Sequence, residues 1–375
     1  MMDCQFLLRI KRRPQAVEHD QHGNQHPHRD LEALQRLSAA YGRLVDELHK
    51  TVIGQQQVIE ELLIAMLAGG HALLVGVPGL AKTLIVRSLA ETLDLSFNRI
   101  QFTPDLMPAD ITGTEVIQEN RSTGERSLKF LDGPIFANVV LADEVNRTPP
   151  KTQAALLEAM QEHQVTAGGQ RHALPDPFFV LATQNPIEQE GTYPLPEAQL
   201  DRFMFEIHVD YPDEHEEFEI VRQTTSEQRV SVDKILTRDD IQELQSVVRR
   251  VPVADHVIRY ATQFARLTRR EKGDVPDFVQ SYVSWGAGPR ASQNLILGAK
   301  ARALLNNRPY VGAEDVRAVA IPVLRHRIVT NFNAEAERVT ADDIVRQLID
   351  FISTDSTEDD SGGRLPEIFK SADTH

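Results

Sequence analysis

Residues 72–83 read ALLVGVPGLAKT, an apolar run followed by a loop that contains glycine and proline and ends in Lys82 and Thr83. The apolar run predicts a buried strand, and the loop after it opens a helix. Such a loop lets backbone N–H groups approach a phosphate, and the helix N-terminus adds a favourable dipole. The usual motif has glycine where this chain has Ala81, so φ at Ala81 must be one that an L-residue tolerates. For this loop alone, an ordinary strand-to-helix turn with an ordinary lysine is the alternative.

Two acidic residues follow a second apolar run. Residues 139–144 read VVLADE, so Asp143 and Glu144 lie at the end of a predicted strand. In a nucleotide hydrolase the first carboxylate helps to hold Mg²⁺, with Thr83 as the other ligand, and the second polarises the attacking water. By itself the acidic pair is also compatible with a solvated turn. Its position about sixty residues after Lys82 is typical of nucleotide hydrolases.

Three more polar residues are candidates for nucleotide chemistry. Asn185 ends another apolar run, where its amide can reach the γ-phosphate or its water, although Asn-Pro is also a turn signal. Arg202 begins the fifth run and is interpreted either as an ion-pair partner of Asp201 or as an arginine finger. Arg290 is at the second position of a predicted helix, where a cation opposes the dipole and calls for a compensating anion such as phosphate.

Short apolar runs alternate with helical patterns along the first part of the chain. They predict an α/β fold with a five-stranded parallel sheet, preceded by two helices. Turn signals within residues 114–130, at Ser122-Thr123-Gly124, and within residues 164–172 predict two inserted β-hairpins. The expected strands are residues 72–75, 99–102, 139–142, 178–182 and 203–209.

Helical patterns replace the strands after residue 211, which predicts a domain boundary there. The expected organisation is a disordered, histidine-rich leader, a nucleotide-binding domain, a helical domain without strands and a disordered acidic tail. These four segments are residues 1–30, 31–211, 212–353 and 354–375.

Composition limits the classes of function. The 375 residues suggest roughly two or three domains. With 40 Lys+Arg against 55 Asp+Glu, the net charge of −15 disfavours general binding to nucleic acid. The single cysteine, Cys4, rules out an intrachain disulfide and is compatible with a reducing cytoplasm. Residues 62–81 carry no formal charge, but Gly69, Gly70 and Pro78 interrupt them, so we expect no membrane span.

Taken together, these motifs resemble those of AAA+ ATPases and, more narrowly, of the MoxR family, over residues 35–350 approximately. By this resemblance, residues 76–83 are the Walker A motif, Asp143 and Glu144 the Walker B motif, and Asn185 sensor 1. Arg202 is then the arginine finger and Arg290 sensor 2. The Ala81 variant is usual in this family, whereas Gly288 replaces a frequent serine and the histidine-rich leader has no counterpart. The nucleotide contacts implied are Val52, Ile53, Gly54, Gly76, Pro78, Gly79, Leu80, Ala81, Lys82, Thr83 and Leu84.

The resemblance implies a P-loop AAA+ core with inserted hairpins, which match the helix-2 and pre-sensor-1 inserts, followed by a helical lid domain. It further implies a cytoplasmic, Mg²⁺-dependent ATPase that forms a homo-oligomer, a hexamer by expectation. Its role would be to remodel or mature partner protein complexes, including cofactor insertion, with a partner that contains a von Willebrand A domain.

Two other functions compete with this one. The first is a DNA-directed AAA+ motor, either helicase-like or transcription-activating. Against it stand the net charge of −15 and a hairpin, residues 164–172, in which Arg171 is the only fixed positive charge. The second is a nucleotide-binding scaffold without turnover, which has no need of the carboxylate of Glu144.

Overall fold

The computed structural model describes residues 26–119, 126–187, 191–226 and 231–352. Most of the predicted leader, the Ser122-Thr123-Gly124 turn and the acidic tail lie outside these residues. Helix α1 (His26–His49) begins before Leu31, so residues 26–30 of the expected leader are helical. The apolar periodicity that predicted this helix begins only at Leu31, so it could not reveal that the polar residues before Leu31 are also helical.

The central sheet has five parallel strands, which confirms the predicted fold class. Its strands lie in the order β2 (Phe97–Gln101), β5 (Val139–Asp143), β8 (Phe179–Gln184), β1 (Ala72–Val75) and β9 (Phe205–His208). Strands β2 and β9 differ from the predicted 99–102 and 203–209 because Phe102 and Phe203 are buried without lying in a strand. Apolar character reports burial, whereas strand pairing depends on the neighbouring backbone.

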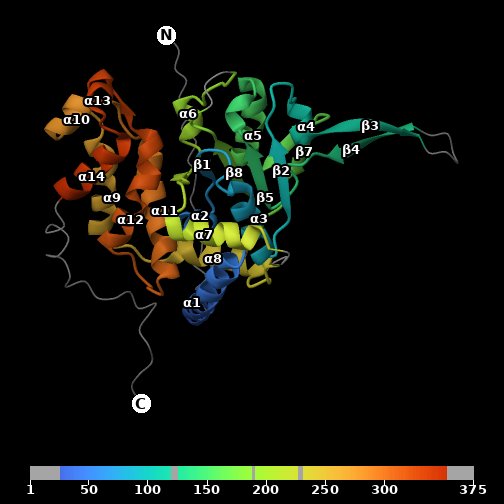
Figure 1. The fold of residues 1–375 in the computed structure, drawn as a ribbon, viewed down its shortest axis with the longest axis horizontal. Coiled ribbons are helices and arrows are strands. Elements are labelled where there is room, and N and C mark those ends of the chain that lie inside the picture. The colour runs from blue at the N-terminus through green and yellow to red at the C-terminus, as the bar shows by residue number, and fades with distance from the viewer. Residues whose placement is uncertain (1–25, 120–125, 188–190, 227–230, 353–375) are drawn as a thin grey trace, which may run out of the picture.

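Helices cover both faces of the sheet (Figure 1). Alternate strand residues belong to two separate cores, as the period of two in a strand requires. Leu74, Leu141 and Leu181 pack with α1, α2 (Gln56–Leu67) and α3 (Lys82–Thr92). Leu73, Val140 and Val180 pack on the other face with α5 (Pro150–Glu162). Helix α4 (Pro108–Thr112) contributes Ile111 to this second core.

Both predicted hairpins are present. They are β3 (Gly113–Glu119) with β4 (Arg126–Asp132), and β6 (Gln164–Ala167) with β7 (Gln170–Ala173). Figure 1 shows the longer hairpin extending away from the body. At its base, the ring of Phe130 stacks on that of His172 at a centroid distance of 3.9 Å, so the two hairpins contact each other.

The chain after residue 211 is mostly helical, but the prediction that it contains no strand is wrong. Strands β10 (Val283–Trp285) and β11 (Val329–Thr330) form a small antiparallel pair. Strands of two and three residues are too short for an alternation of apolar and polar side chains to be recognised in the sequence. The division between domains near residue 211 stays a prediction. The helices are α7 (Glu214–Thr224), α8 (Arg238–Arg250), α9 (Asp255–Leu267), α10 (Asp277–Tyr282), α11 (Pro289–Leu305), α12 (Ala313–Leu324), α13 (Phe332–Glu337) and α14 (Ala341–Phe351).

Residues 62–81 do not form one long apolar helix. They divide into the end of α2, a turn at Gly69 and Gly70, strand β1 and the loop before α3. Across the described residues, the model contains no helix that is both long and apolar enough to cross a membrane.

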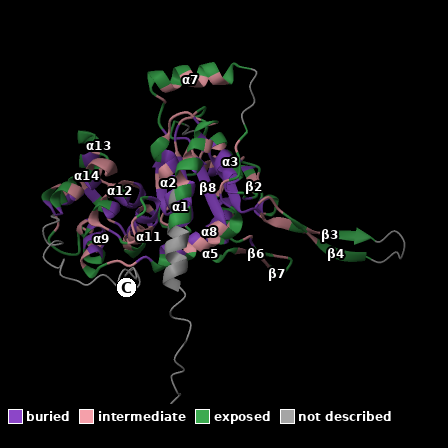
Figure 2. Cartoon of the chain, turned by 90° about the horizontal axis from the view of Figure 1, so that it is seen from below, coloured by how far each residue is buried: buried purple, intermediate pink, exposed green. Residues whose placement is uncertain are grey.

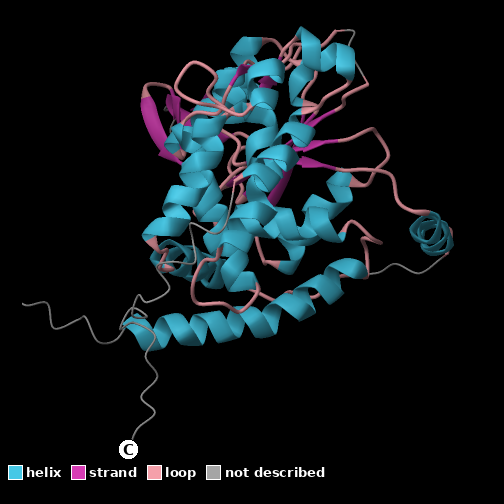
Figure 3. Cartoon of the chain, turned by 90° about the vertical axis from the view of Figure 1, so that its left-hand side faces the viewer, coloured by secondary structure: helices cyan, strands magenta, loops and turns pink. Residues whose placement is uncertain are grey.

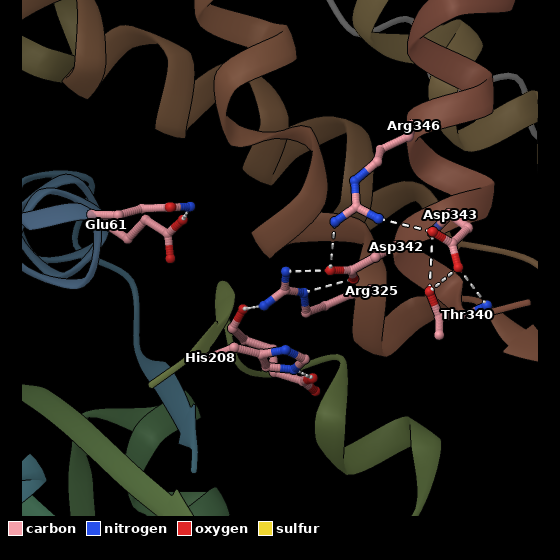
Figure 4. A network of polar contacts seen from close by, with 9 residues as sticks. Glu61, His208, Arg325, Thr340, Asp342, Asp343 and Arg346 are labelled. Carbon is pink, nitrogen blue, oxygen red and sulfur yellow. Dashed lines mark hydrogen bonds and ion pairs between the residues drawn. The ribbon is translucent and has the colours of Figure 1, made fainter. Parts of the chain in front are cut away.

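The short helix η2 (Arg325–Arg327) joins the C-terminal helices to the amino end of β9. Arg325 makes a bidentate ion pair with Asp342 of α14, at 2.6 and 2.9 Å, and also donates to the Glu206 carbonyl oxygen (Figure 4). The buried guanidinium of Arg327 donates to Asp201 Oδ1 at 2.8 Å, to the Phe203 carbonyl oxygen at 2.7 Å and to the Val323 carbonyl oxygen. These bonds tie the C-terminal helices to the edge strand β9.

We predict that Arg327→Ala lowers the free energy of unfolding by about 2–4 kcal/mol, because buried carbonyl oxygens lose a charged donor. Urea unfolding of full-length protein measures this change. The matched control is Arg346→Ala, which removes an exposed arginine of α14 and should change the stability by less than about 1 kcal/mol. Equal losses in the two variants would contradict a special role for Arg327.

Candidate active site

The carboxyl ends of the parallel strands place three sequence-distant motifs at one edge of the sheet. The loop at residues 76–81 follows β1, Glu144 follows β5 and Asn185 follows β8. Together they form a pocket of ≈ 360 Å³. Its lining residues are Pro78, Gly79, Leu80, Ala81, Lys82, Thr83, Arg99, Asp143, Glu144, Thr183, Gln184 and Asn185.

Lys82 is the first residue of α3 and points back across the loop. Its Nζ donates to the carbonyl oxygens of Gly76 at 2.6 Å and Val77 at 2.8 Å. Burial lowers the pKa of Lys82, while the negative charges of Asp143 and Glu144 act in the opposite direction. Ala81 has φ +55° and ψ +20°, in the small left-handed region. That conformation is tolerated by an L-residue at a cost of about 1 kcal/mol.

Asp143 is held by two side chains that sequence reasoning did not identify. Arg99 of β2 donates to Asp143 Oδ2 from Nη2 at 2.5 Å and from Nε at 3.0 Å. Thr183 of β8 donates from Oγ1 to Asp143 Oδ1 at 2.6 Å. Thr183 lies in the same strand-end motif as Asn185, and this position was the only sign of Thr183 in the sequence. Nothing in the sequence places β2 beside β5, so Arg99 could not be found.

Glu144 has an unusual backbone conformation for a non-glycine residue, with φ +57° and ψ +49°. Its N–H donates to Thr183 Oγ1 at 2.8 Å. Its carboxylate accepts from Gln101 Nε2 at 2.8 Å and pairs with Arg147 Nε at 3.2 Å. Backbone strain of this kind persists where neighbours fix it and is concentrated at functional sites.

Asn185 is almost fully buried, and its Oδ1 accepts from the Ile187 N–H at 3.2 Å. Gly76 and Leu84 lie outside the pocket. A Cβ at Gly76 would be 2.5 Å from the Val209 carbonyl oxygen, so this glycine permits a close backbone approach. Leu84 is partly exposed on α3.

A second cavity, of ≈ 650 Å³, lies between the α1–α2 connection and α7. Val52, Ile53 and Gly54 line it on one side, and Glu219, Arg222 and Gln223 of α7 line it on the other. The resemblance to AAA+ proteins assigns the first three residues to the adenine side of the nucleotide.

Arg202 and Arg290 lie elsewhere. Arg202 is in the turn between α6 (Glu197–Leu200) and β9, not within the strand, and therefore at the amino edge of the sheet. Its side chain has no hydrogen bond or ion pair within the described ranges. The interpretation of Arg202 as the partner of Asp201 is wrong, since Asp201 pairs with Arg327 at 2.8 Å and with Arg290 Nη1 at 3.5 Å.

Arg290 is the second residue of α11, as predicted. Its contact with Asp201 places it beside Arg202, and neither arginine lines the pocket at the carboxyl edge. The structure thus divides the predicted site into two groups, one on each edge of the sheet.

The residues of the carboxyl-edge pocket fit a nucleotide with a divalent cation. The open side of Gly79, where a Cβ would meet no atom within 4 Å, leaves room beside the loop. Lys82 supplies positive charge, while Thr83 and Asp143 supply oxygen ligands. The part of the chain that the structure describes has no cluster of three or more His, Cys, Asp or Glu side chains suited to a metal. Few protein ligands are typical of Mg²⁺ bound with substrate phosphates.

Comparisons with known proteins agree with this geometry. Residues 71–205 match the ATPase family associated with various cellular activities (AAA), and residues 277–348 match the AAA lid domain. A solved structure from Cytophaga hutchinsonii, described as a candidate ATPase, is 44% identical with a TM-score of 0.78 and covers 86% of this chain and 97% of its own.

Named relatives extend the likeness over most of the chain. Chaperone MoxR1 of Mycobacterium tuberculosis is 40% identical over 333 residues, which is 88% of this chain and 87% of that protein. Protein MoxR of Paracoccus denitrificans is 32% identical over 319 residues, 81% of this chain and 91% of that protein. The chain is therefore a member of the MoxR family of AAA+ ATPases, whose named relatives include a chaperone.

Proposed function

We propose that this protein hydrolyses ATP in a homo-oligomeric ring, a hexamer by family resemblance, in order to remodel or mature partner protein complexes. The observation that carries this proposal is the position of Arg202 and Arg290 at the sheet edge opposite the P-loop. With this arrangement neither Arg202 nor Arg290 lies beside the P-loop of its own subunit, so each would act on the nucleotide of a neighbour.

Each residue of the carboxyl-edge pocket has a distinct role in this proposal. Lys82 and the loop N–H groups bind the substrate phosphates, and Thr83 and Asp143 hold Mg²⁺, which supplies charge neutralisation. Glu144 orients the attacking water and accepts its proton, while Asn185 orients the γ-phosphate side of the site. Thr183 is a positioning residue because it fixes both Asp143 and Glu144.

The arginines act between subunits in this proposal. Strand β9 has four residues, so its two ends lie about 13 Å apart. An arginine side chain at the amino edge does not span that distance to the P-loop of its own subunit. Arg202 has no intramolecular partner within the described chain and is free to contact the next subunit. Arg290, held by Asp201 beside it, would enter the same neighbouring site.

The client function rests on family membership. The relative from Mycobacterium tuberculosis is named a chaperone, which supports a protein client. Cofactor insertion, a partner with a von Willebrand A domain and a cytoplasmic location are the finer parts of the proposal. A DNA-directed motor is not favoured, since the net charge is −15 and the short hairpin holds one arginine.

We predict that Lys82→Ala loses ATP affinity, whereas Glu144→Gln binds ATP normally and does not turn it over. The first change removes ground-state phosphate contacts and the second removes water activation alone. Nucleotide affinity and turnover of both variants measure this. Equal loss of binding in the two variants would contradict the assignment.

The same pair of variants tests the client function. With ATP present, Glu144→Gln should retain a client protein in affinity capture, because the ATP-bound state persists. Lys82→Ala is the matched control and should retain none. Identical sets of captured proteins would argue against ATP-dependent remodelling.

We predict that Thr183→Val raises the Mg²⁺ concentration needed for half-maximal turnover by about tenfold or more, since Asp143 loses a donor that orients it. Thr183→Ser keeps the hydroxyl and should remain close to wild type. Titration of ATPase activity with Mg²⁺ distinguishes the two. If serine and valine behave alike, the hydroxyl does not position Asp143.

We predict that Arg202→Ala binds ATP with near-normal affinity and loses turnover by about 10³-fold or more. Mixed with Glu144→Gln, it should recover part of the activity, because some interfaces then pair an intact Glu144 with an intact Arg202. Arg290→Ala should show the same recovery. Subunit-exchanged mixtures that remain as inactive as either parent would refute action between subunits.

A further inference from the structure

Helix α7 is barely covered by the other residues that the structure describes. None of its 11 residues is buried. Its half-buried residues, Glu216, Glu219, Ile220 and Gln223, share one helix face, and Gln223 on that face donates to the Lys50 carbonyl oxygen. An uncovered helix of this length is marginal in water. Figure 3 shows α7 apart from the packed helices, and Figure 2 shows the same separation.

The outer face of α7 combines apolar and acidic side chains. Phe218 is 64% exposed and Val221 is 55% exposed, one turn apart. Glu214 and Glu217 flank them and are exposed. Neither of these glutamates forms an ion pair within the ranges that the structure describes. Phe218 and Val221 thus form a small exposed apolar patch with acids at its rim, and a polar rim around apolar surface is found at protein–protein interaction sites.

A pocket of opposite character lies on the lid. It has a volume of ≈ 450 Å³ and lies along α9 and the segment that follows it. Arg259, Arg266 and Lys272 line it and are exposed, and none of the three has an ion pair among the described residues. With Asp274 as the one acid in the lining, the pocket is basic on balance. Ile258, 43% exposed, and the half-buried Val275 add apolar surface. In a chain with net charge −15, such a basic pocket is a distinctive local feature.

We propose that the outer face of α7 in one subunit docks into this α9 pocket on the lid of the next subunit. Phe218 and Val221 would meet Ile258 and Val275, and Glu214 and Glu217 would pair with Arg259 and Arg266. The occupant is a second copy of this chain because both complementary surfaces belong to it. Within one chain, Figure 2 shows α7 and α9 near opposite edges.

This contact has the symmetry that a ring requires. Two different surfaces on one chain form a heterologous contact, which closes into a ring when the rotation permits. An 11-residue helix is only about 16 Å long, so the contact supplements the interface around Arg202. The inner face of α7 lines the cavity beside Val52, Ile53 and Gly54. Docking of the outer face would therefore link the lid of the next subunit, through α7, to the cavity beside Val52, Ile53 and Gly54. The inference rests on the proposed oligomer.

Charge reversal provides the test. One variant carries Glu214→Arg and Glu217→Arg, and the other carries Arg259→Glu and Arg266→Glu. Each alone places like charges at every interface, and should raise the protein concentration at which rings and ATPase activity are half-maximal by roughly tenfold. A mixture of the two variants pairs opposite charges at every interface of an alternating ring and should restore wild-type assembly. Mass photometry and ATPase activity, both in Mg-ATP, measure these effects.

Three further measurements separate the possible outcomes. Glu158→Arg with Glu162→Arg on α5 makes the same change in net charge as the α7 variant and should leave assembly unchanged. If the mixture fails to recover while wild-type protein forms active rings, this inference is refuted and the proposed function stands. If wild type forms no ring and no ATPase activity, the proposed function fails first. If instead the α7 variant assembles normally and the α9 pocket becomes accessible only when residues 353–375 are removed, the acidic tail occupies the pocket. In that case the inference is wrong.

Discussion

Strand polarity is the constraint on which the rest of this molecule depends. Because all five strands of the sheet are parallel, the segments that follow them meet at one edge and the segments that precede them meet at the other. The P-loop, Glu144 and Asn185 are therefore neighbours although they are far apart in sequence. Arg202 precedes its strand and is excluded from that group for the same reason. One rule of sheet topology thus gathers the residues of the binding pocket and separates Arg202 from them.

The amino edge is organised by the lid rather than by the sheet. Arg327 of η2 binds Asp201 and the Phe203 carbonyl oxygen, and Arg325 joins Glu206 to Asp342 (Figure 4). Asp201 in turn contacts Arg290 from the start of α11. The position of the arginines that we assign to the neighbouring site therefore depends on how the lid is docked. Movement of the lid would change that position without any change in the P-loop.

Two residues at the carboxyl edge are held in left-handed conformations that glycine would adopt more easily. Ala81 and Glu144 both have φ close to +55°. At Glu144, Thr183 satisfies the backbone N–H while Gln101 and Arg147 hold the carboxylate. Contacts from β2, β8 and the following turn thus compensate for the strain, and the result is a carboxylate with a defined position. A glycine would remove the strain together with the carboxylate.

The sequence by itself determined the five-stranded sheet, the two hairpins and most residues of the carboxyl-edge pocket, because each of these is encoded locally. Apolar runs report burial, and the P-loop, Asp143, Glu144 and Asn185 each belong to a continuous motif at a strand end. Tertiary structure alone placed Arg99 and Gln101 beside the acids, since strand order is not written in any one segment. The contact of Arg290 with Asp201 and the exposed outer face of α7 are also visible only in the tertiary structure. Both depend on which distant segments lie together after the chain has folded.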